Sequence, residues 1–166
     1  NGEALVCTGD LLWSLTHGAY GVAADSNNNV VVVGGTLSIP GIFITKLAPN
    51  GVVLWTLTAG TNDFNERATA VAIDPSDNII VGGNHQYADF GGGPLLGSTF
   101  LIKLDPEGNL LWTKGLGTAN DFAYQSSIAA DPSGDIVITG HIDGTFSFGG
   151  PNLNTQWPIA FLAKLD

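Results

Sequence analysis

Aromatic, acidic and imidazole side chains gather in the segments of this chain that do not repeat. Aromatic rings can stack on the apolar faces of sugar rings, while carboxylates and imidazoles bond to hydroxyl groups. Loops held by a rigid scaffold commonly carry binding residues. We therefore expect a site for a glycan or a surface protein on the non-repeating loops. The candidate residues are Trp157, Tyr87, Tyr124, Asp89, Asp121, Asp143 and His141.

The same carboxylates leave an enzymatic alternative open. Two carboxyl groups about 5–10 Å apart can cleave a glycosidic bond. The chain has no Gly-x-Ser-x-Gly, His-Glu-x-x-His or phosphate-loop motif, and the spacing of its acids selects no pair. We assign no catalytic residue and expect a non-enzymatic binding or structural module. A polysaccharide-acting enzyme and a fragment of a larger secreted protein are the alternatives.

A second group of charged residues recurs along the chain. Aspartates open three polar turns, and a lysine recurs in three Phe-x-x-Lys-Leu segments. Aspartate at a turn commonly accepts backbone N–H bonds, so we expect turn caps or structural ion pairs. The turns faintly resemble acidic Ca²⁺ loops but lack the further carboxylates of an EF-hand. We expect no cofactor, with Ca²⁺ as the lesser alternative. The recurring residues are Asp25, Asp74, Asp131, Lys46, Lys103 and Lys164.

These residues are spaced by a threefold repeat that begins at Leu-Leu-Trp or Val-Leu-Trp, at 11–13, 53–55 and 110–112. Each unit combines a Trp segment, an apolar segment ending in Asp, a β-branched run closed by Gly, and Phe-x-x-Lys-Leu. Short runs of this kind bounded by Gly, Pro, Asn and Asp predict strands joined by tight turns. The expected strands are 10–15, 21–25, 30–33, 43–47, 52–57, 70–74, 79–81, 100–104, 109–114, 128–131, 136–139 and 161–165.

Four antiparallel strands per repeat predict an all-β fold of the β-propeller type. We expect one domain over 1–166, with three blades at 21–57, 70–114 and 128–166. The third blade lacks its own last strand, and segment 10–15 is a last strand without a blade. Up-and-down blades place the long loops 60–69, 84–99, 117–127 and 141–158 at one end, and only tight turns at the other.

The motifs Asp-Pro-Ser-Gly-Asp at 131–135, Lys-Leu-Asp-Pro-Glu-Gly at 103–108 and Leu-Leu-Trp at 110–112, in their repeated order, resemble the bacterial SBBP-type β-propeller repeat. The likeness covers essentially 9–166. It implies a propeller from a secreted or cell-surface bacterial protein, and it transfers no catalytic residue. The first unit departs from the pattern, with Leu-Ala-Pro-Asn at 47–50 and shorter loops.

Composition narrows the classes of partner. The 166 residues carry 15 acidic and 5 basic side chains, a net charge of −10. This balance argues against nucleic-acid binding and against adhesion to anionic membranes. No apolar run is long enough for membrane insertion. The single cysteine, Cys7, excludes an internal disulfide. We expect an extracellular or cell-surface location.

Three blades are too few to close a propeller, which usually has about four to eight. Their open faces and edges would invite further association. Two copies would supply six blades, so we expect a homodimeric ring in which segment 10–15 of one copy completes the third blade of the other. A linear polymer of the same contacts is the alternative. The expected interface residues are Leu11, Leu12, Trp13, Phe161 and Lys164.

Overall fold

Thirteen strands and no helix make up the described part of the chain, which in this computed structural model comprises residues 18–35, 41–60, 66–85, 88–118 and 122–166. Neighbouring strands pair antiparallel in every sheet of these residues. The all-β prediction is therefore confirmed. Within the same residues, no helix is long and apolar enough to cross a membrane.

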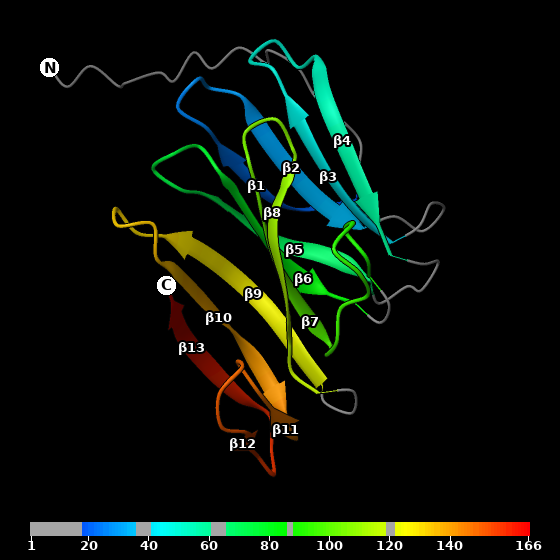
Figure 1. Cartoon of the computed structure of the whole chain (residues 1–166), viewed down its shortest axis with the longest axis vertical. Coiled ribbons are helices and arrows are strands. Elements are labelled where there is room, and N and C mark those ends of the chain that lie inside the picture. The colour runs from blue at the N-terminus through cyan, green and yellow to red at the C-terminus, as the bar shows by residue number, and fades with distance from the viewer. Residues whose placement is uncertain (1–17, 36–40, 61–65, 86–87, 119–121) are drawn as a thin grey trace, which may run out of the picture.

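Two four-stranded sheets follow each other along the chain, each a meander in sequence order (Figure 1). The first sheet consists of β1 (Ala19–Ala24), β2 (Val30–Gly35), β3 (Ile42–Leu47) and β4 (Val53–Ala59). The second consists of β5 (Arg67–Ile73), β6 (Ile79–Asn84), β7 (Thr99–Leu104) and β8 (Leu110–Leu116). Strand order and turn positions are the same in both sheets, as a sequence repeat requires.

The third sheet has three strands in the order β13-β10-β9. They are β9 (Phe122–Ala130), β10 (Ile136–Asp143) and β13 (Ile159–Leu165). Between β10 and β13 a separate hairpin forms from β11 (Thr145–Phe146) and β12 (Leu153–Asn154). β13 occupies the position of β3 and β7, but no fourth strand pairs with it among the described residues. Segment 10–15, the predicted strand at the start of the chain, lies outside those residues.

Several strands extend further than the sequence pattern predicts, always toward the end with the long loops. The prediction ended three strands before Gly34, Gly83 and Gly140, but β2, β6 and β10 continue through these glycines. A Cβ atom at Gly34 would lie 2.6 Å from the Phe43 ring, and one at Gly140 would lie 2.8 Å from the Phe161 ring. Glycine here makes room for a ring on the neighbouring strand and does not end the ladder.

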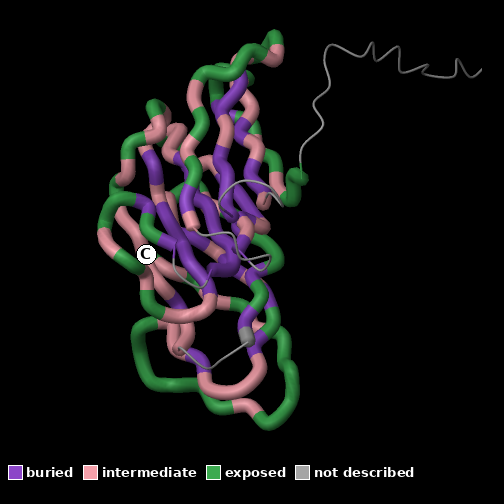
Figure 2. The backbone as a smooth tube through the Cα atoms, turned by 90° about the vertical axis from the view of Figure 1, so that its right-hand side faces the viewer, coloured by how far each residue is buried: buried purple, intermediate pink, exposed green. Residues whose placement is uncertain are grey.

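The second sheet lies between the other two and is buried on both faces, as the purple segments in Figure 2 show. Alternate residues of a strand point to opposite faces. On one face Ile79, Val81 and Ile102 pack with residues of the first sheet. On the other face Ile80 and Leu101 pack with residues of the third sheet. The three sheets are therefore stacked side by side through two separate apolar cores.

Candidate functional site

Each of three turns is held by the carboxylate of the aspartate that opens it. Asp25 Oδ1 accepts the backbone N–H groups of Asn27 at 2.9 Å and Asn29 at 2.8 Å. The Asn29 side chain donates from Nδ2 to Asp25 Oδ2 at 2.9 Å. The turns at 74–78 and 105–109 repeat all three bonds. Asp131 Oδ1 accepts the backbone N–H groups of Ser133 at 2.8 Å and Asp135 at 3.1 Å. The turn-capping prediction is thus confirmed for Asp25, Asp74 and Asp131.

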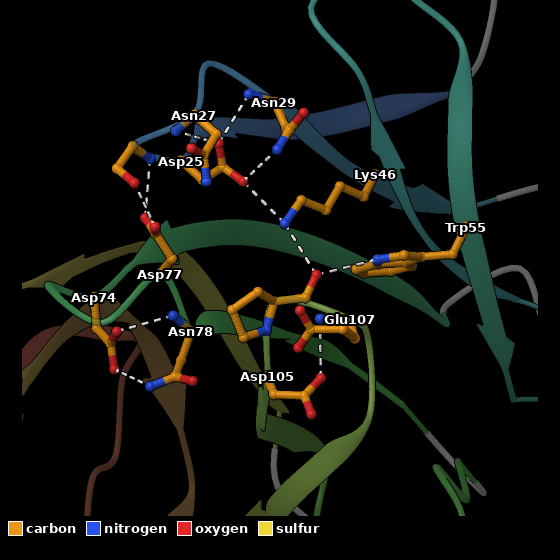
Figure 3. Close-up of polar contacts among 12 residues, drawn as sticks. Asp25, Asn27, Asn29, Lys46, Trp55, Asp74, Asp77, Asn78, Asp105 and Glu107 are labelled. Carbon is orange, nitrogen blue, oxygen red and sulfur yellow. Dashed lines mark hydrogen bonds and ion pairs between the residues drawn. The ribbon is translucent and has the colours of Figure 1, made fainter.

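The recurring lysine joins this turn to the next sheet (Figure 3). Lys46 Nζ lies 2.9 Å from Asp25 Oδ2 and donates to the carbonyl oxygen of Pro106 at 2.9 Å. Trp55 Nε1 donates to the same carbonyl at 3.3 Å. Pro106 belongs to the turn between β7 and β8, so two side chains of the first sheet bind one backbone oxygen of the second. We call this arrangement of Asp, Lys, Trp and carbonyl the inter-sheet clamp.

A second link lies beside the inter-sheet clamp. Ser26 donates its backbone N–H to Asp77 Oδ1 at 2.9 Å, and its hydroxyl to Asp77 Oδ2. Asp77 has a φ of 61°, in the left-handed region that residues other than glycine rarely adopt. Because the equivalent residue of the next turn, Gly134, has no side chain, this link cannot be repeated between the second and third sheets.

The clamp becomes more exposed along the chain. The recurring lysine side chain is 5% exposed at Lys46, 19% at Lys103 and 55% at Lys164. Lys103 pairs with Asp74 at 2.8 Å, and Lys164 pairs with Asp131 at 2.8 Å and with Asp135 at 2.9 Å. The predicted ion pairs are thus confirmed in all three sheets. The exposure of the lysine depends on the sheet that follows it. A complete four-stranded sheet covers Lys46, a three-stranded sheet covers Lys103, and no described sheet covers Lys164.

The clamp aspartates are held in their charged form. Burial is the largest effect on the pKa of Asp25 and would raise it, but the bonds from Asn29 and Lys46 together bring this pKa below its ordinary value. Burial would also raise the pKa of Asp74, but the bonds from Lys103 and Asn78 bring this pKa below its ordinary value. For Asp131 the bond from Lys164 is the main cause of a lowered pKa. Each carboxylate therefore favours the folded state at neutral pH.

The predicted ligand residues lie in different parts of the structure and differ in exposure. Tyr87 and Asp121 lie outside the described residues. Trp157 is 77% exposed and lies just before β13, whose first residue pairs with Ile142 of β10. Asp89 is exposed, and its Oδ1 accepts the N–H groups of Gly91 and Gly93 at 2.7 and 3.0 Å.

Tyr124 and His141 were expected in loops, and this expectation was wrong. Both lie in strands, and they are paired partners across β9 and β10. The strands continue here because a bulge at Ser126 lets β9 follow β10 to its end, where Asp143 pairs with Phe122. Tyr124 and His141 thus share the face of the third sheet that is turned away from the second sheet, and both are exposed.

Two of the predicted interface residues are described, and they point to opposite sides of β13. Phe161 is partly buried against the core between the second and third sheets, with its ring centroid 5.1 Å from Phe148 and 5.9 Å from Phe146. Lys164 lies on the opposite face. Leu11, Leu12 and Trp13 lie outside the described residues.

The loop phenylalanines serve the core. Phe90 is buried, and its ring centroid is 4.9 Å from that of Phe100. Phe146 is buried and meets Phe148 edge to face at 4.8 Å. These rings therefore anchor their loops to the core and are not available to a ligand, whereas Trp157 is exposed.

Buried polar groups near the loop end were missed by the sequence analysis. Asn84 donates to the carbonyl of Ala123, while its Oδ1 has no partner in the described structure. The Gln125 amide is buried beside Gly82, and neither its oxygen nor its nitrogen has a partner there. Burial lowers the pKa of His85, partly offset by Glu66. One signal was available, because Gln125 stands where the repeat otherwise has Ala19 and Ala68.

Comparison with known proteins supports a repeat architecture. No family model matches the chain, so the likeness to the SBBP-type repeat stays a resemblance. An uncharacterised WD repeat-containing protein of Acanthamoeba polyphaga mimivirus is 28% identical over 167 residues, covering 76% of this chain and 12% of that protein. The chain thus spans a small part of its relative. WD repeats form four-stranded propeller blades.

Solved structures also match the chain. One of them is a protein of unknown function from Bacteroides caccae, with a TM-score of 0.36 and 15% identity, covering 89% of this chain and 60% of that one.

Substituting the recurring lysine should have effects graded by burial. Lys46→Met leaves the Asp25 carboxylate buried without its cation, so we expect the free energy of unfolding to fall by about 3 kcal/mol. Lys164→Met changes a pair that is exposed in the single chain, so its effect on the monomer should be much smaller. Chemical denaturation of both variants, at protein concentrations at which the chain is monomeric, measures the difference. Equal losses in the monomers would contradict the graded clamp.

The clamp also predicts how stability depends on pH. A carboxylate with a lowered folded pKa stabilises the protein above its unfolded pKa, near 4, and this stabilisation is lost as pH falls through the folded pKa. The free energy of unfolding should therefore decrease from about pH 5 toward pH 2. In Lys46→Met the Asp25 carboxylate loses the lysine that lowers its pKa. The free energy of unfolding should therefore change less steeply with pH in this variant than in the wild type. Denaturation at a series of pH values compares the wild type with Lys46→Met. Identical slopes would show that Asp25 does not contribute to the pH dependence of stability.

The buried Gln125 amide should reduce stability. Leucine has a similar size and needs no hydrogen bond, so we expect Gln125→Leu to raise the free energy of unfolding by about 1 kcal/mol. Thermal and chemical unfolding of the variant measure the change. A loss of stability would indicate that Gln125 bonds to ordered water or another group.

Proposed function

We propose that this chain is a β-propeller module that binds a glycan at its loop end and does not act as a catalyst. The first and second sheets are complete four-stranded blades in this assignment, and the third is a blade without its outermost strand. The repeated sheet order and the likeness to a WD repeat-containing protein support it. One observation carries the functional part: the large exposed aromatic ring of Trp157 beside β13.

The recurring charged residues are excluded from ligand binding by their bonds. Lys46 and Asp25 are buried and bind each other, and Lys46 also binds the carbonyl of Pro106. Trp55 donates to the same oxygen. These side chains serve the scaffold, which leaves the non-repeating residues to carry recognition.

The loop end of the third sheet offers the chemistry that sugars need. Trp157 presents a ring that can stack on a pyranose, with an indole N–H that can donate to a hydroxyl. Asp143, at the end of β10, is partly exposed and can accept hydroxyl hydrogens. A glycan is therefore the ligand class that we propose here.

The described loop acids fit recognition better than hydrolysis. Asp89 is held by two backbone N–H groups of its own turn, and Glu66 is buried. The net charge of −10 suits a highly soluble domain, and with the resemblance to secreted repeats it leads us to propose an extracellular or cell-surface location.

A glycan array tests this function. Wild-type protein should retain a defined set of glycans, and Trp157→Ala should weaken binding about tenfold or more, because a stacking surface of at least about 1.4 kcal/mol is lost. The matched control is Leu96→Ala, which removes another exposed apolar side chain from a different loop. Absence of glycan binding by the wild type, or equal loss in both variants, would overturn the proposal.

A further inference from the structure

In the described part of the chain, two sheet faces have exposed apolar side chains at their centres. The first sheet presents Val22, which is 68% exposed, on the face turned away from the second sheet. We call this face, with Val22, Val32, Thr45 and Thr56, the leading face. The third sheet presents Leu162, which is 76% exposed, on its own outward face. We call that face, with Val137, Thr139, Leu162 and Lys164, the trailing face.

The equivalent positions of the second sheet are buried by neighbouring sheets. Val71 stands three residues before its turn aspartate, as Val22 does, and it packs into the core shared with the first sheet. Leu101 stands two residues before the recurring lysine, as Leu162 does, and it is buried in the core shared with the third sheet. At these two positions both exposed faces therefore carry the apolar residues that the second sheet buries against its neighbours.

The two exposed faces also carry the residues equivalent to the Lys46 and Pro106 pair of the inter-sheet clamp. Lys46 reaches the carbonyl of Pro106, in the turn that joins the last two strands of the next sheet. Lys164 occupies the place of Lys46 on the trailing face and is already held by Asp131 and Asp135. In the first sheet Pro49 occupies the place of Pro106. In the second sheet the carbonyl at this place, that of Pro106, accepts two donors at once, Lys46 Nζ and Trp55 Nε1.

We infer that the leading face of a second copy of this chain packs on the trailing face, in the manner in which the second sheet packs on the first. This inference rests on the propeller assignment proposed above. Lys164 then donates to the carbonyl of Pro49 of the second copy, and Leu162 packs beside Val22 of that copy. Because each copy has one leading and one trailing face, two copies close a ring of six blades, within the usual range for propellers.

Among the described residues no strand pairs with the outer edge of β13, and the sequence contains a motif that matches this edge. β3 and β7 pair at this edge with β4 and β8, which carry the Val-Leu-Trp and Leu-Leu-Trp motifs. The same motif occurs once more, at 11–13, so the second copy supplies this sequence as well. Strand addition to an open edge satisfies unpaired backbone groups.

The arrangement reassigns two predicted ligand residues, His141 and its pairing partner Tyr124, which lie on the same face of the third sheet. His141 stands on β10 where Asn84 stands on β6, and Asn84 is buried by the third sheet. His141 is accordingly covered when the second copy docks, and it becomes an interface residue. Trp157 lies outside both faces and stays available to a ligand.

Light scattering on size-exclusion fractions of the 166-residue chain tests the inference. Wild type should have the mass of two chains. Val22→Asp and Leu162→Lys should each yield monomers, since either substitution affects both contacts of the ring. An equimolar mixture of the two variants should recover a dimer, because one contact is wild type and the other pairs Asp with Lys. Leu96→Asp, at an exposed apolar residue outside both faces, should remain dimeric.

A monomeric wild type, larger polymers, or a dimer insensitive to both substitutions would overturn the inference. Circular dichroism and the unfolding midpoint confirm that the variants fold, which the exposure of Val22 and Leu162 leads us to expect. Glycan binding is measured on the same fractions. A monomer that still binds glycans through Trp157 overturns the assembly alone, whereas a dimer that binds none overturns the proposed function alone.

Discussion

A β-sheet that is apolar on both faces must be covered on both faces, and this constraint governs the molecule. The second sheet meets it within the chain, since Val81 packs toward the first sheet and Leu101 toward the third. The outer sheets have the same alternation of apolar residues but only one neighbour each. The identical strand order of the repeats therefore produces one fully covered sheet and two half-covered sheets, and the exposed residues Val22 and Leu162 follow directly from that count.

The inter-sheet clamp gives this stacking its register. Apolar faces alone permit sliding, whereas the bonds of Lys46 and Trp55 to one carbonyl of Pro106 fix where one sheet stands on the next. A buried ion pair adds little net stability but strongly disfavours arrangements that separate its charges. The clamp lies at the turn end, so that end tolerates little variation. Insertions collect at the opposite end, where Phe90 and Phe146 anchor the loops.

The sequence was sufficient to predict the features that recur and insufficient for those that occur once. The strands, the aspartate turns and the ion pairs were predicted because each repeats with fixed spacing. Gly34 and Gly140 were misread as strand ends, because glycine also serves close ring packing, which depends on a neighbouring strand. Tyr124 and His141 were placed in loops for the same reason. The buried amide of Gln125 has no local signature, because its surroundings are created by the third sheet packing on Gly82.

Ligand binding and assembly are separable in the proposed architecture, because one involves the ends of the strands and the other involves the faces of the sheets. In the proposed ring, packing between copies uses side chains that point out of a sheet face, such as Leu162 and His141. The proposed ligand site uses residues beyond the ends of the strands, such as Trp157, which no further sheet needs to cover. Such a ring could change its ligand through the loops without disturbing the clamp. The non-repeating residues are free to vary in this way because the repeating ones already hold the blades together.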